Sequence, residues 1–220
     1  RTRYKLFFDY LYLKIGKTWF VFKLMYFWNF LWIENNSTFL VYLKSIYLLE
    51  ILIKMENKKT VALIYDFDGT LSPGNMQEFG FMKAIGENED EFWKKCDKLS
   101  KENDANHILC YMYQMLKEAS YRNISLKRSS FRDFGASVEL FPGVVEWFQK
   151  INKIGEENGL KILHFINSSG LKEMIEGTPI YKEFENVYAC SFLYNSDGIA
   201  YWPAVAVDYT TKTQFLFKIN

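Results

Sequence analysis

The chain has 220 residues, enough for one domain with a sizeable core or for a domain that carries an insertion. The formal net charge of +1 argues neither for nor against nucleic acid, and we expect no nucleic-acid partner. The three cysteines lack metal-ligand spacing, which indicates reduced thiols and a cytoplasmic location. The two histidines are too few for a histidine metal cluster, and they argue against a Ser-His triad.

Residues 1–54 differ in composition from the rest of the chain. They hold 16 of the 41 aromatic residues, and 8 Lys and Arg against 3 Asp and Glu. The composition changes sharply at Lys54-Met55, after which an ordinary strand pattern begins. We therefore leave residues 1–54 out of the catalytic argument.

Two interpretations of residues 1–54 compete. The apolar segments Thr18–Ile33 and Thr38–Ile53 could associate with a membrane, and a membrane partner is expected only if this region is genuine. The longest charge-free run is Leu24–Ile33, well short of the roughly 18–20 residues that a spanning helix needs, because charges interrupt the segments at Lys23, Lys44 and Glu50. The alternative, which we favour, is that Met55 is the true start and that the preceding residues translate AT-rich upstream DNA.

The first element after Met55 is a strand over Thr60–Tyr65, predicted from its continuous apolar character. Asp66 and Asp68 follow it directly, and Gly69-Thr70 come next. Two carboxylates this close repel each other unless a cation lies between them or one carries a proton. The pattern indicates a metal site, a proton-transfer role or both, and its structural alternative is an Asp-Gly turn that closes the strand.

From Asn75 to about Leu140 the pattern is helical. Two apolar stripes at helical spacing predict packing against a core; they are Phe92, Trp93, Cys96 and Leu99, and then Ile108, Leu109, Met112, Met115 and Leu116. We expect His107 to be a structural or surface residue. The basic residues of Ser125–Phe134 predict a solvated face.

The remaining elements alternate between helix and strand. We expect a helix over Val144–Ile154, a strand over Leu160–Ile166 and a helix that opens at Asn167-Ser168-Ser169-Gly170. Two strands, Asn186–Leu193 and Gly198–Val207, are joined by a hairpin turn, and a final helix covers Thr210–Ile219 with Asp208 or Thr210 as its cap.

This order predicts an α/β fold: an open, mostly parallel sheet whose first loop carries an all-helical insertion. The core would comprise residues 55–74 and 141–220, and the helical insertion residues 75–140. Such an insertion would close over a site at the carboxyl end of the first strand, exclude water and select the substrate.

At Leu63–Leu71 the chain resembles the haloacid dehalogenase (HAD) superfamily, whose first motif is Asp-x-Asp-Gly-Thr after a buried strand. The resemblance implies a Rossmann-like core with a helical cap. It implies that Asp66 is a nucleophile that forms an aspartyl-phosphate, that Asp68 is the general acid and base, and that both help to hold Mg²⁺. Gly69 and Thr70 would contact the substrate.

The second and third motifs of that family are matched less closely. The second is an apolar strand that ends in a Ser or Thr bound to the phosphoryl oxygens. Ser168 matches it, although the polar Asn167 and His164 allow the alignment to move to Ser169. The third motif is a Lys that offsets the charge of the nucleophile and the phosphate; Lys212 fits best, and Lys218 falls too late in its helix.

The family's fourth motif, one or two acids on a later loop, is absent, since only Lys218 is charged after Lys212. We expect that the C-terminal part of the core is missing and that this fragment is inactive or weakly active, because Mg²⁺ demands near-ideal octahedral geometry.

The predicted function is a Mg²⁺-dependent phosphomonoesterase that acts on a small phosphorylated metabolite. The alternatives are a phosphotransferase or phosphomutase of the same fold, a binding fragment without catalysis, and a membrane-anchored phosphatase if residues 1–54 are genuine.

Overall fold

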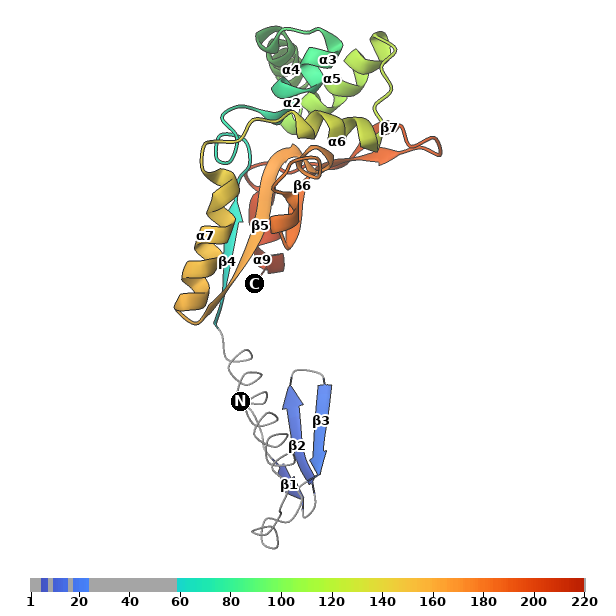
Figure 1. Cartoon of the computed structure of the whole chain (residues 1–220). Coiled ribbons are helices and arrows are strands. Elements are labelled where there is room, and N and C mark those ends of the chain that lie inside the picture. The colour runs from blue at the N-terminus through green and yellow to red at the C-terminus, as the bar shows by residue number, and fades with distance from the viewer. Residues whose placement is uncertain (1–4, 8–9, 16–17, 24–58, 220) are drawn as a thin grey trace, which may run out of the picture. The chain divides into compact units, whose positions relative to one another are not determined.

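The computed structural model describes residues 5–7, 10–15, 18–23 and 59–219, which belong to two compact units, Arg1–Lys59 and Thr60–Asn220 (Figure 1). In the first unit, β1 (Lys5–Phe7), β2 (Tyr10–Ile15) and β3 (Thr18–Lys23) form an antiparallel sheet. The segment Thr38–Ile53 and the greater part of Thr18–Ile33 lie outside the described residues. Within the described ranges, no helix has both the length and the apolar character needed to cross a bilayer.

The second unit is built on a four-stranded sheet with the order β4-β5-β6-β7. These strands are β4 (Lys59–Tyr65), β5 (Leu160–Leu171), β6 (Asn186–Tyr194) and β7 (Ala200–Val205). β5 and β6 are parallel, β6 and β7 are antiparallel, and Figure 1 shows β4 running in the same direction as β5. The predicted open, mostly parallel sheet is therefore confirmed.

The chain between β4 and the next strand is helical, as predicted. It contains α2 (Met76–Phe79), α3 (Phe81–Ile85), α4 (Glu89–Asn103), α5 (His107–Tyr121), α6 (Arg128–Ala136) and α7 (Val144–Glu157). Figure 1 shows α2–α6 gathered beyond the carboxyl ends of β4 and β5, while α7 lies alongside these strands. The predicted domain boundaries at residues 75 and 140 stay predictions.

Local sequence explains where α4 and α5 begin. The side chain of Asn88 accepts a hydrogen bond from the Glu91 N–H, and Asn106 accepts from the second and third residues of α5. An Asn at this position satisfies backbone N–H groups that have no partner within the helix. Met112 and Met115 of the predicted α5 stripe are fully buried and pack in the core as expected, whereas Leu109 of the same stripe is 44% exposed, so that part of the prediction was wrong.

Helix α6 approaches α8 (Lys172–Ile175) closely through two glycines. A Cβ on Gly135 would lie 1.9 Å from the Met174 carbonyl oxygen, and one on Gly177 would lie 2.0 Å from that of Arg132. Arg132 also pairs with Glu176 of the core at 2.8 Å. The basic residues around α6 are exposed, as the expected solvated face requires, and one of them, Arg132, also joins α6 to the residue after α8.

The end of β5 differs from the prediction. Asn167–Gly170 do not open a helix: they lie within β5, which continues to Leu171, and the single turn α8 begins at Lys172. The register with β6 shifts between Asn167 and Leu171. Pairing with β6 holds these residues extended around that shift, and irregularities of this kind are common beside active sites.

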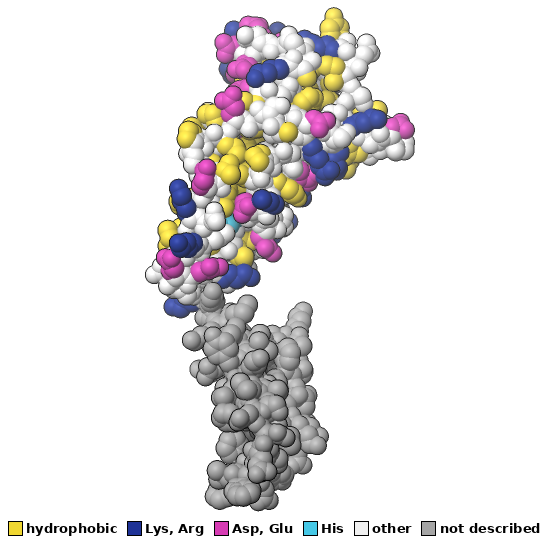
Figure 2. Space-filling view, viewed as in Figure 1, with side chains coloured by type: hydrophobic (Ala, Val, Ile, Leu, Met, Phe, Trp, Pro, Cys, Tyr) yellow, Lys and Arg dark blue, Asp and Glu magenta, His cyan; other side chains and the backbone are white. Residues whose placement is uncertain are grey.

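The C-terminal elements match the expected pattern. β6 and β7 form the predicted hairpin, in which Gly198 has φ +73° and donates to the Asn195 carbonyl at 3.0 Å. A short 3₁₀ turn, η1 (Tyr181–Glu183), precedes this hairpin, and α9 (Thr211–Ile219) follows it. On the face shown in Figure 2, acidic and basic side chains are interspersed over the second unit.

Candidate active site

A tight turn follows β4 and sets the direction of both acids. The Phe67 carbonyl accepts hydrogen bonds from the N–H groups of Thr70, Leu71 and Ser72. Gly69 has φ +72°, a left-handed conformation that favours glycine, and its N–H donates to Ser72 at 2.8 Å. The N–H groups of Gly69 and Thr70 are thus used within the turn, and their predicted role in substrate binding stays a prediction.

Asp66 lies at the carboxyl end of β4 with an accessible carboxylate. Its Oδ1 accepts from the Phe67 N–H at 2.8 Å, and its Oδ2 lies 2.5 Å from the Lys212 Nζ. The Asp66 side chain is 43% exposed and that of Lys212 is 25% exposed. The structure therefore joins the predicted nucleophile and the predicted lysine, which are 146 positions apart in the sequence.

Two contacts fix the start of α9 and so place Lys212. The Asp208 carboxylate accepts hydrogen bonds from the Thr210 hydroxyl and from the N–H groups of Thr210 and Thr211. These bonds lower the pKa of the Asp208 carboxyl, and the bond from the Thr210 hydroxyl contributes most. Asn167 donates from Nδ2 to the Lys212 carbonyl at 2.8 Å. Asn167, a polar residue near the end of β5, therefore connects that strand to α9, the helix that carries Lys212.

Asp68 is the more enclosed of the two acids. Its Oδ1 accepts from the Met76 N–H at 3.0 Å. Burial raises the pKa of the Asp68 carboxyl to about 7; the Met76 bond opposes this shift, and the charges of Asp66 and Glu78 add to it. A Cβ on Gly170 would lie 3.1 Å from Asp68 Oδ2 and 2.2 Å from Met76 Cε, so a glycine permits this close packing. A carboxyl group with a pKa near 7 is suited to proton transfer at neutral pH.

Ser168 and Ser169 occupy different environments. Ser168 is fully buried, and its Oγ accepts from the Gly170 N–H at 3.0 Å. Ser169 lines the pocket beside Asp68, and its carbonyl accepts from the Tyr111 hydroxyl at 2.8 Å. The structure thus brings Ser169, and not Ser168, to the pocket. Ser168 lies within β5 and not at the expected helix start, and its predicted contact with phosphate stays a prediction.

A chain of hydrogen bonds supports the strand ends behind the acids. The Trp147 indole donates to the Tyr65 hydroxyl at 2.9 Å, and this hydroxyl lies 2.9 Å from His164 Nδ1. His164 Nε2 lies 2.9 Å from the Asn152 Oδ1. Burial lowers the pKa of His164, which agrees with a neutral ring that accepts from Tyr65 and donates to Asn152. His164 is therefore a paired core residue.

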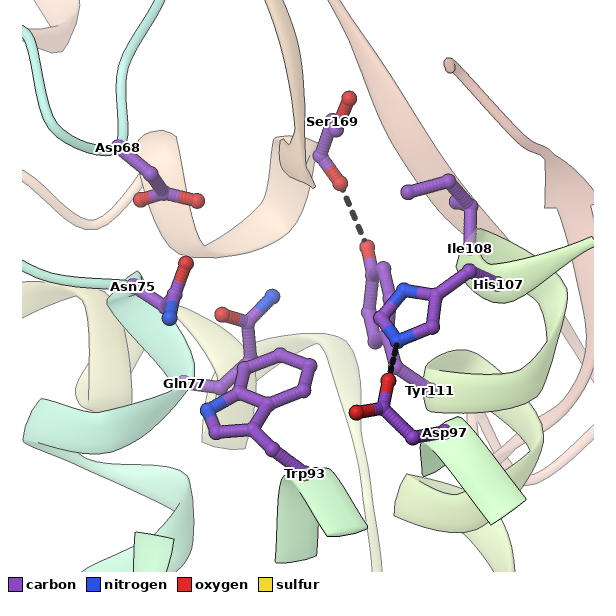
Figure 3. A pocket seen from close by; sticks show the side chains of 9 residues that line it. All are labelled: Asp68, Asn75, Gln77, Trp93, Asp97, His107, Ile108, Tyr111 and Ser169. Atoms are coloured by element: carbon purple, nitrogen blue, oxygen red, sulfur yellow. Dashed lines mark hydrogen bonds and ion pairs between the residues drawn. The ribbon is translucent and has the colours of Figure 1, made fainter. Parts of the chain in front are cut away.

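On the helical side of Asp68 lies a pocket of about 280 Å³ (Figure 3). The helices and the segment before them contribute most of its lining, which is Asn75, Gln77, Trp93, Asp97, His107, Ile108 and Tyr111. His107 Nε2 lies 2.9 Å from Asp97 Oδ1, and its ring stacks on Trp93. Our sequence analysis had assigned Trp93 to packing and His107 to a structural or surface role, and it had left Gln77 and Asp97 out. No motif marks these residues; they meet only because α2, α4 and α5 pack together.

The donors present fit Mg²⁺ only as a hydrated site. In the part of the chain that the structure describes, no group of three or more His, Cys, Asp or Glu residues could hold a metal ion. Mg²⁺ nevertheless often binds one or two carboxylates together with substrate phosphate and several waters. The exposed Asp66 carboxylate can supply one such ligand, and the backbone carbonyl of Asp68 a second oxygen.

Comparisons with known proteins were made by sequence and by structure. No protein-family model matches the sequence. An uncharacterized protein of Borreliella burgdorferi is 29% identical over 191 residues, and the match covers 75% of this chain and 66% of that protein. The chain therefore spans just under two thirds of the length of this curated relative.

Two solved structures share the fold. A substrate-bound phosphoserine phosphatase is 16% identical with a TM-score of 0.52, and the match covers 74% of this chain and 71% of that one. A HAD family hydrolase from Salmonella enterica serovar Typhi is 11% identical with a TM-score of 0.50, and the match covers 74% of this chain and 51% of that one. At these low identities the two matches show that the chain shares the fold of these proteins.

Proposed function

We propose that this chain carries a phosphomonoesterase site in which Asp66 is the nucleophile and Asp68 the general acid and base. The observation that carries the proposal is the contact between Asp66 Oδ2 and Lys212 Nζ at 2.5 Å, beside a second acid that is enclosed. A carboxylate is ionised at neutral pH and needs no activating base. A lysine next to it offsets the charge of an approaching phosphoryl group.

The proposed reaction has two steps. In the first, an Asp66 oxygen bonds to phosphorus while the bond from phosphorus to the alcohol oxygen breaks, and Asp68 gives its proton to that oxygen. In the second, the Asp68 carboxylate takes a proton from a water molecule whose oxygen attacks phosphorus. The bond from phosphorus to Asp66 breaks, inorganic phosphate leaves, and both acids return to their starting state.

Several residues would support these steps. Lys212 would stay next to the transferring phosphoryl group, and Ser168 and Ser169 stay predicted phosphate contacts, of which Ser169 is the better placed. The Asp66 carboxylate and the Asp68 backbone carbonyl would hold Mg²⁺, which would supply positive charge for the phosphoryl oxygens. A small phosphorylated metabolite remains the proposed substrate, in agreement with a pocket of about 280 Å³.

The test is hydrolysis of p-nitrophenyl phosphate by the chain, with and without Mg²⁺. We expect Asp66→Asn to lower turnover at least about 1,000-fold, as removal of a nucleophile does elsewhere. Asp133→Asn is the matched control, because Asp133 is an exposed acid of α6. Mass spectrometry of an acid-quenched reaction should find a phosphoryl group on the peptide that contains Asp66.

One observation favours a second candidate, a binding domain without catalysis. Among the described residues no third acid, His or Cys joins Asp66 and Asp68 in a metal-binding group. If turnover is absent, the phosphomonoesterase proposal is wrong and this candidate replaces it. If turnover survives Asp66→Asn, the assignment of Asp66 as the nucleophile is wrong. A phosphotransferase would instead be recognised by transfer of the phosphoryl group to an added alcohol in preference to water.

A further inference from the structure

A buried acceptor without a donor lies in the pocket next to Asp68. Gln77 is 2% exposed, and its Oε1 has no hydrogen-bond partner among the described residues. Figure 3 shows its amide between Asp68 and Trp93. A buried polar atom left unpaired costs about 1–3 kcal/mol. The position of Gln77 therefore favours a ligand that brings an O–H or N–H donor into the pocket.

Asp97 supplies the negative charge of the pocket, because the Asp68 carboxyl carries the proton that it gives to the leaving oxygen and burial raises the pKa of the Tyr111 hydroxyl well above its usual value. The ionisable lining residues of the pocket are Asp68, Asp97, Tyr111 and His107, and His107 already pairs with Asp97; no lysine or arginine lines it within the described residues. Glu78 lies close by, since its carboxylate accepts from the indole of a pocket residue at 2.9 Å. Two like charges about 4 Å apart repel by about 4 kcal/mol at an effective dielectric constant of 20. A carboxylate on a ligand would meet this repulsion from Asp97, whereas Lys212 lies on the side of Asp66, where the phosphoryl group is proposed to bind.

The shape of the pocket limits the ligand to a small one. A volume of about 280 Å³ lies near the lower end of the roughly 300–1,000 Å³ found for small-molecule pockets. Trp93 and Ile108 give it an apolar wall, while Asn75 and Gln77 offer amide groups. An alcohol of a few carbon atoms with further hydroxyl or amino groups matches this mixture.

We propose, on the basis of the phosphomonoesterase function above, that this pocket is the subsite for the leaving alcohol of the substrate. It accepts alcohols that are neutral or cationic and that donate a hydrogen bond to Gln77 Oε1, such as small polyols and amino alcohols. It rejects hydroxy acids, because the Asp97 carboxylate lines the pocket that their carboxylate would enter. Gln77 and Asp97 are thus the residues that determine specificity.

The experiment compares ligands that differ by one carboxylate. Binding of ethanolamine phosphate and of phosphoserine is measured by isothermal titration calorimetry on the chain without Mg²⁺, so that the proposed Mg²⁺-dependent hydrolysis does not consume the ligands. We expect ethanolamine phosphate to bind at least about tenfold more tightly, a factor that corresponds to about 1.4 kcal/mol. Glycerol 3-phosphate and 3-phosphoglycerate form a second pair that differs by a carboxylate. We expect glycerol 3-phosphate, which lacks the carboxylate, to bind more tightly.

Three variants connect this order to the pocket. Gln77→Met removes the acceptor at nearly constant side-chain volume. It should weaken the binding of ethanolamine phosphate about fivefold, which is the effect of one neutral hydrogen bond. Gln149→Met, at an exposed position of α7, is the matched control and should change nothing. Asp97→Lys changes a side chain that is 55% exposed, so we expect the variant to fold. It should reduce the ratio of the two affinities, for ethanolamine phosphate over phosphoserine, at least about fivefold.

The outcomes separate this inference from the proposed function. If phosphoserine binds as tightly as ethanolamine phosphate, if no ligand binds, or if Gln77→Met and Asp97→Lys leave the order unchanged, the assignment of the pocket is wrong. Turnover of p-nitrophenyl phosphate by the same chain is measured separately. Binding in the expected order without turnover would reject the phosphatase and keep the pocket, whereas turnover without the order would reject the pocket alone.

Discussion

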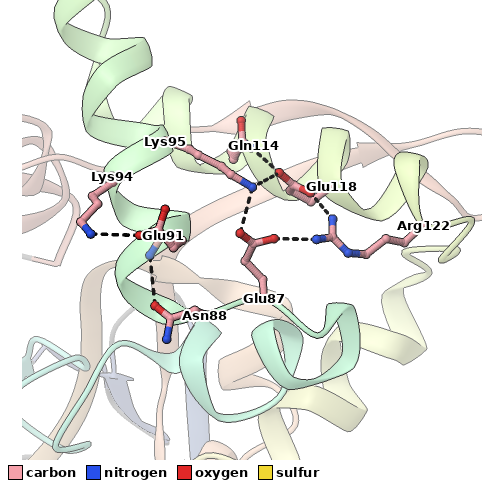
Figure 4. Close-up of polar contacts among 8 residues, drawn as sticks. All are labelled: Glu87, Asn88, Glu91, Lys94, Lys95, Gln114, Glu118 and Arg122. Carbon is pink, nitrogen blue, oxygen red and sulfur yellow. Dashed lines mark hydrogen bonds and ion pairs between the residues drawn. The ribbon is translucent and has the colours of Figure 1, made fainter.

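Two groups of polar side chains in the helical region differ in how well they are paired. The first joins α4 and α5: Lys95 lies 2.8 Å from Glu87 and 2.9 Å from Glu118, and Arg122 pairs with both acids (Figure 4). Gln114 adds a further hydrogen bond to Glu118 at 2.7 Å. Burial acts to raise the pKa of the Glu118 carboxyl, but the bonds from the two basic residues lower it below its usual value.

The second group lies in the pocket, and its pairing is incomplete. Asp68 accepts one backbone N–H, and burial raises the pKa of its carboxyl to about 7. Gln77 Oε1 has no partner among the described residues. In the first group every charge has a partner, and these ion pairs hold α4 and α5 together. In the second group the unpaired atoms remain able to bind a ligand or a proton. The comparison predicts opposite effects on stability when the two groups are changed.

The largest expected effect is that of Asp68→Asn on activity. Loss of the general acid should lower hydrolysis of an alkyl phosphate by about 100- to 10,000-fold. Formation of the aspartyl-phosphate from p-nitrophenyl phosphate should fall much less, because p-nitrophenolate leaves without a proton. Burst kinetics with the two substrates would measure this, and an equal loss in both would contradict the role of Asp68 as an acid.

The same variant should raise stability at alkaline pH. Because the pKa of Asp68 rises from 3.8 to about 7 on folding, ionisation of this carboxyl opposes folding increasingly as the pH rises between these values. Asp68→Asn removes that cost and keeps an acceptor for Met76. We expect a gain of about 1–3 kcal/mol at pH 8 and almost none at pH 4. Urea unfolding at both pH values measures it.

The second expected effect is that of Glu118→Gln, in the opposite direction. This change places an amide N–H₂ against the donors of Lys95 and Arg122, in a side-chain position that is only 10% exposed. We expect the free energy of unfolding at pH 7 to fall by about 1–3 kcal/mol. The matched control is Glu91→Gln, whose ion pair with Lys94 is largely exposed and should contribute much less to the free energy of unfolding. Equal effects of the two changes would contradict the comparison.

The smallest expected effect is that of Gln77→Met on stability. No hydrogen bond of Gln77 Oε1 is lost, so the free energy of unfolding should stay within about 1 kcal/mol of the parent chain or rise. Chemical denaturation measures it alongside the binding experiment. A loss above about 2 kcal/mol would mean that Gln77 holds the fold together, and the two groups would then not differ.

Much of the fold could be predicted because local patterns are decisive there. The apolar stripe that contains Met112 and Met115 specified a core helix, and Gly198 marked the hairpin turn that the structure shows. The end of β5 could not be predicted in the same way. Ser168 and Gly170 suit a helix start equally well, and pairing with β6 decided in favour of the strand.

The same division holds for the site. The spacing of Asp66 and Asp68 by itself determined that two carboxylates would crowd one strand end, because neighbouring positions in a chain cannot separate. Only the tertiary structure decided that Lys212 reaches Asp66 and that Asn167 holds the start of its helix. It alone enclosed Asp68 and placed Gln77 in a pocket without a donor. Burial and contact between distant segments depend on how whole elements pack, and no local pattern contains that information.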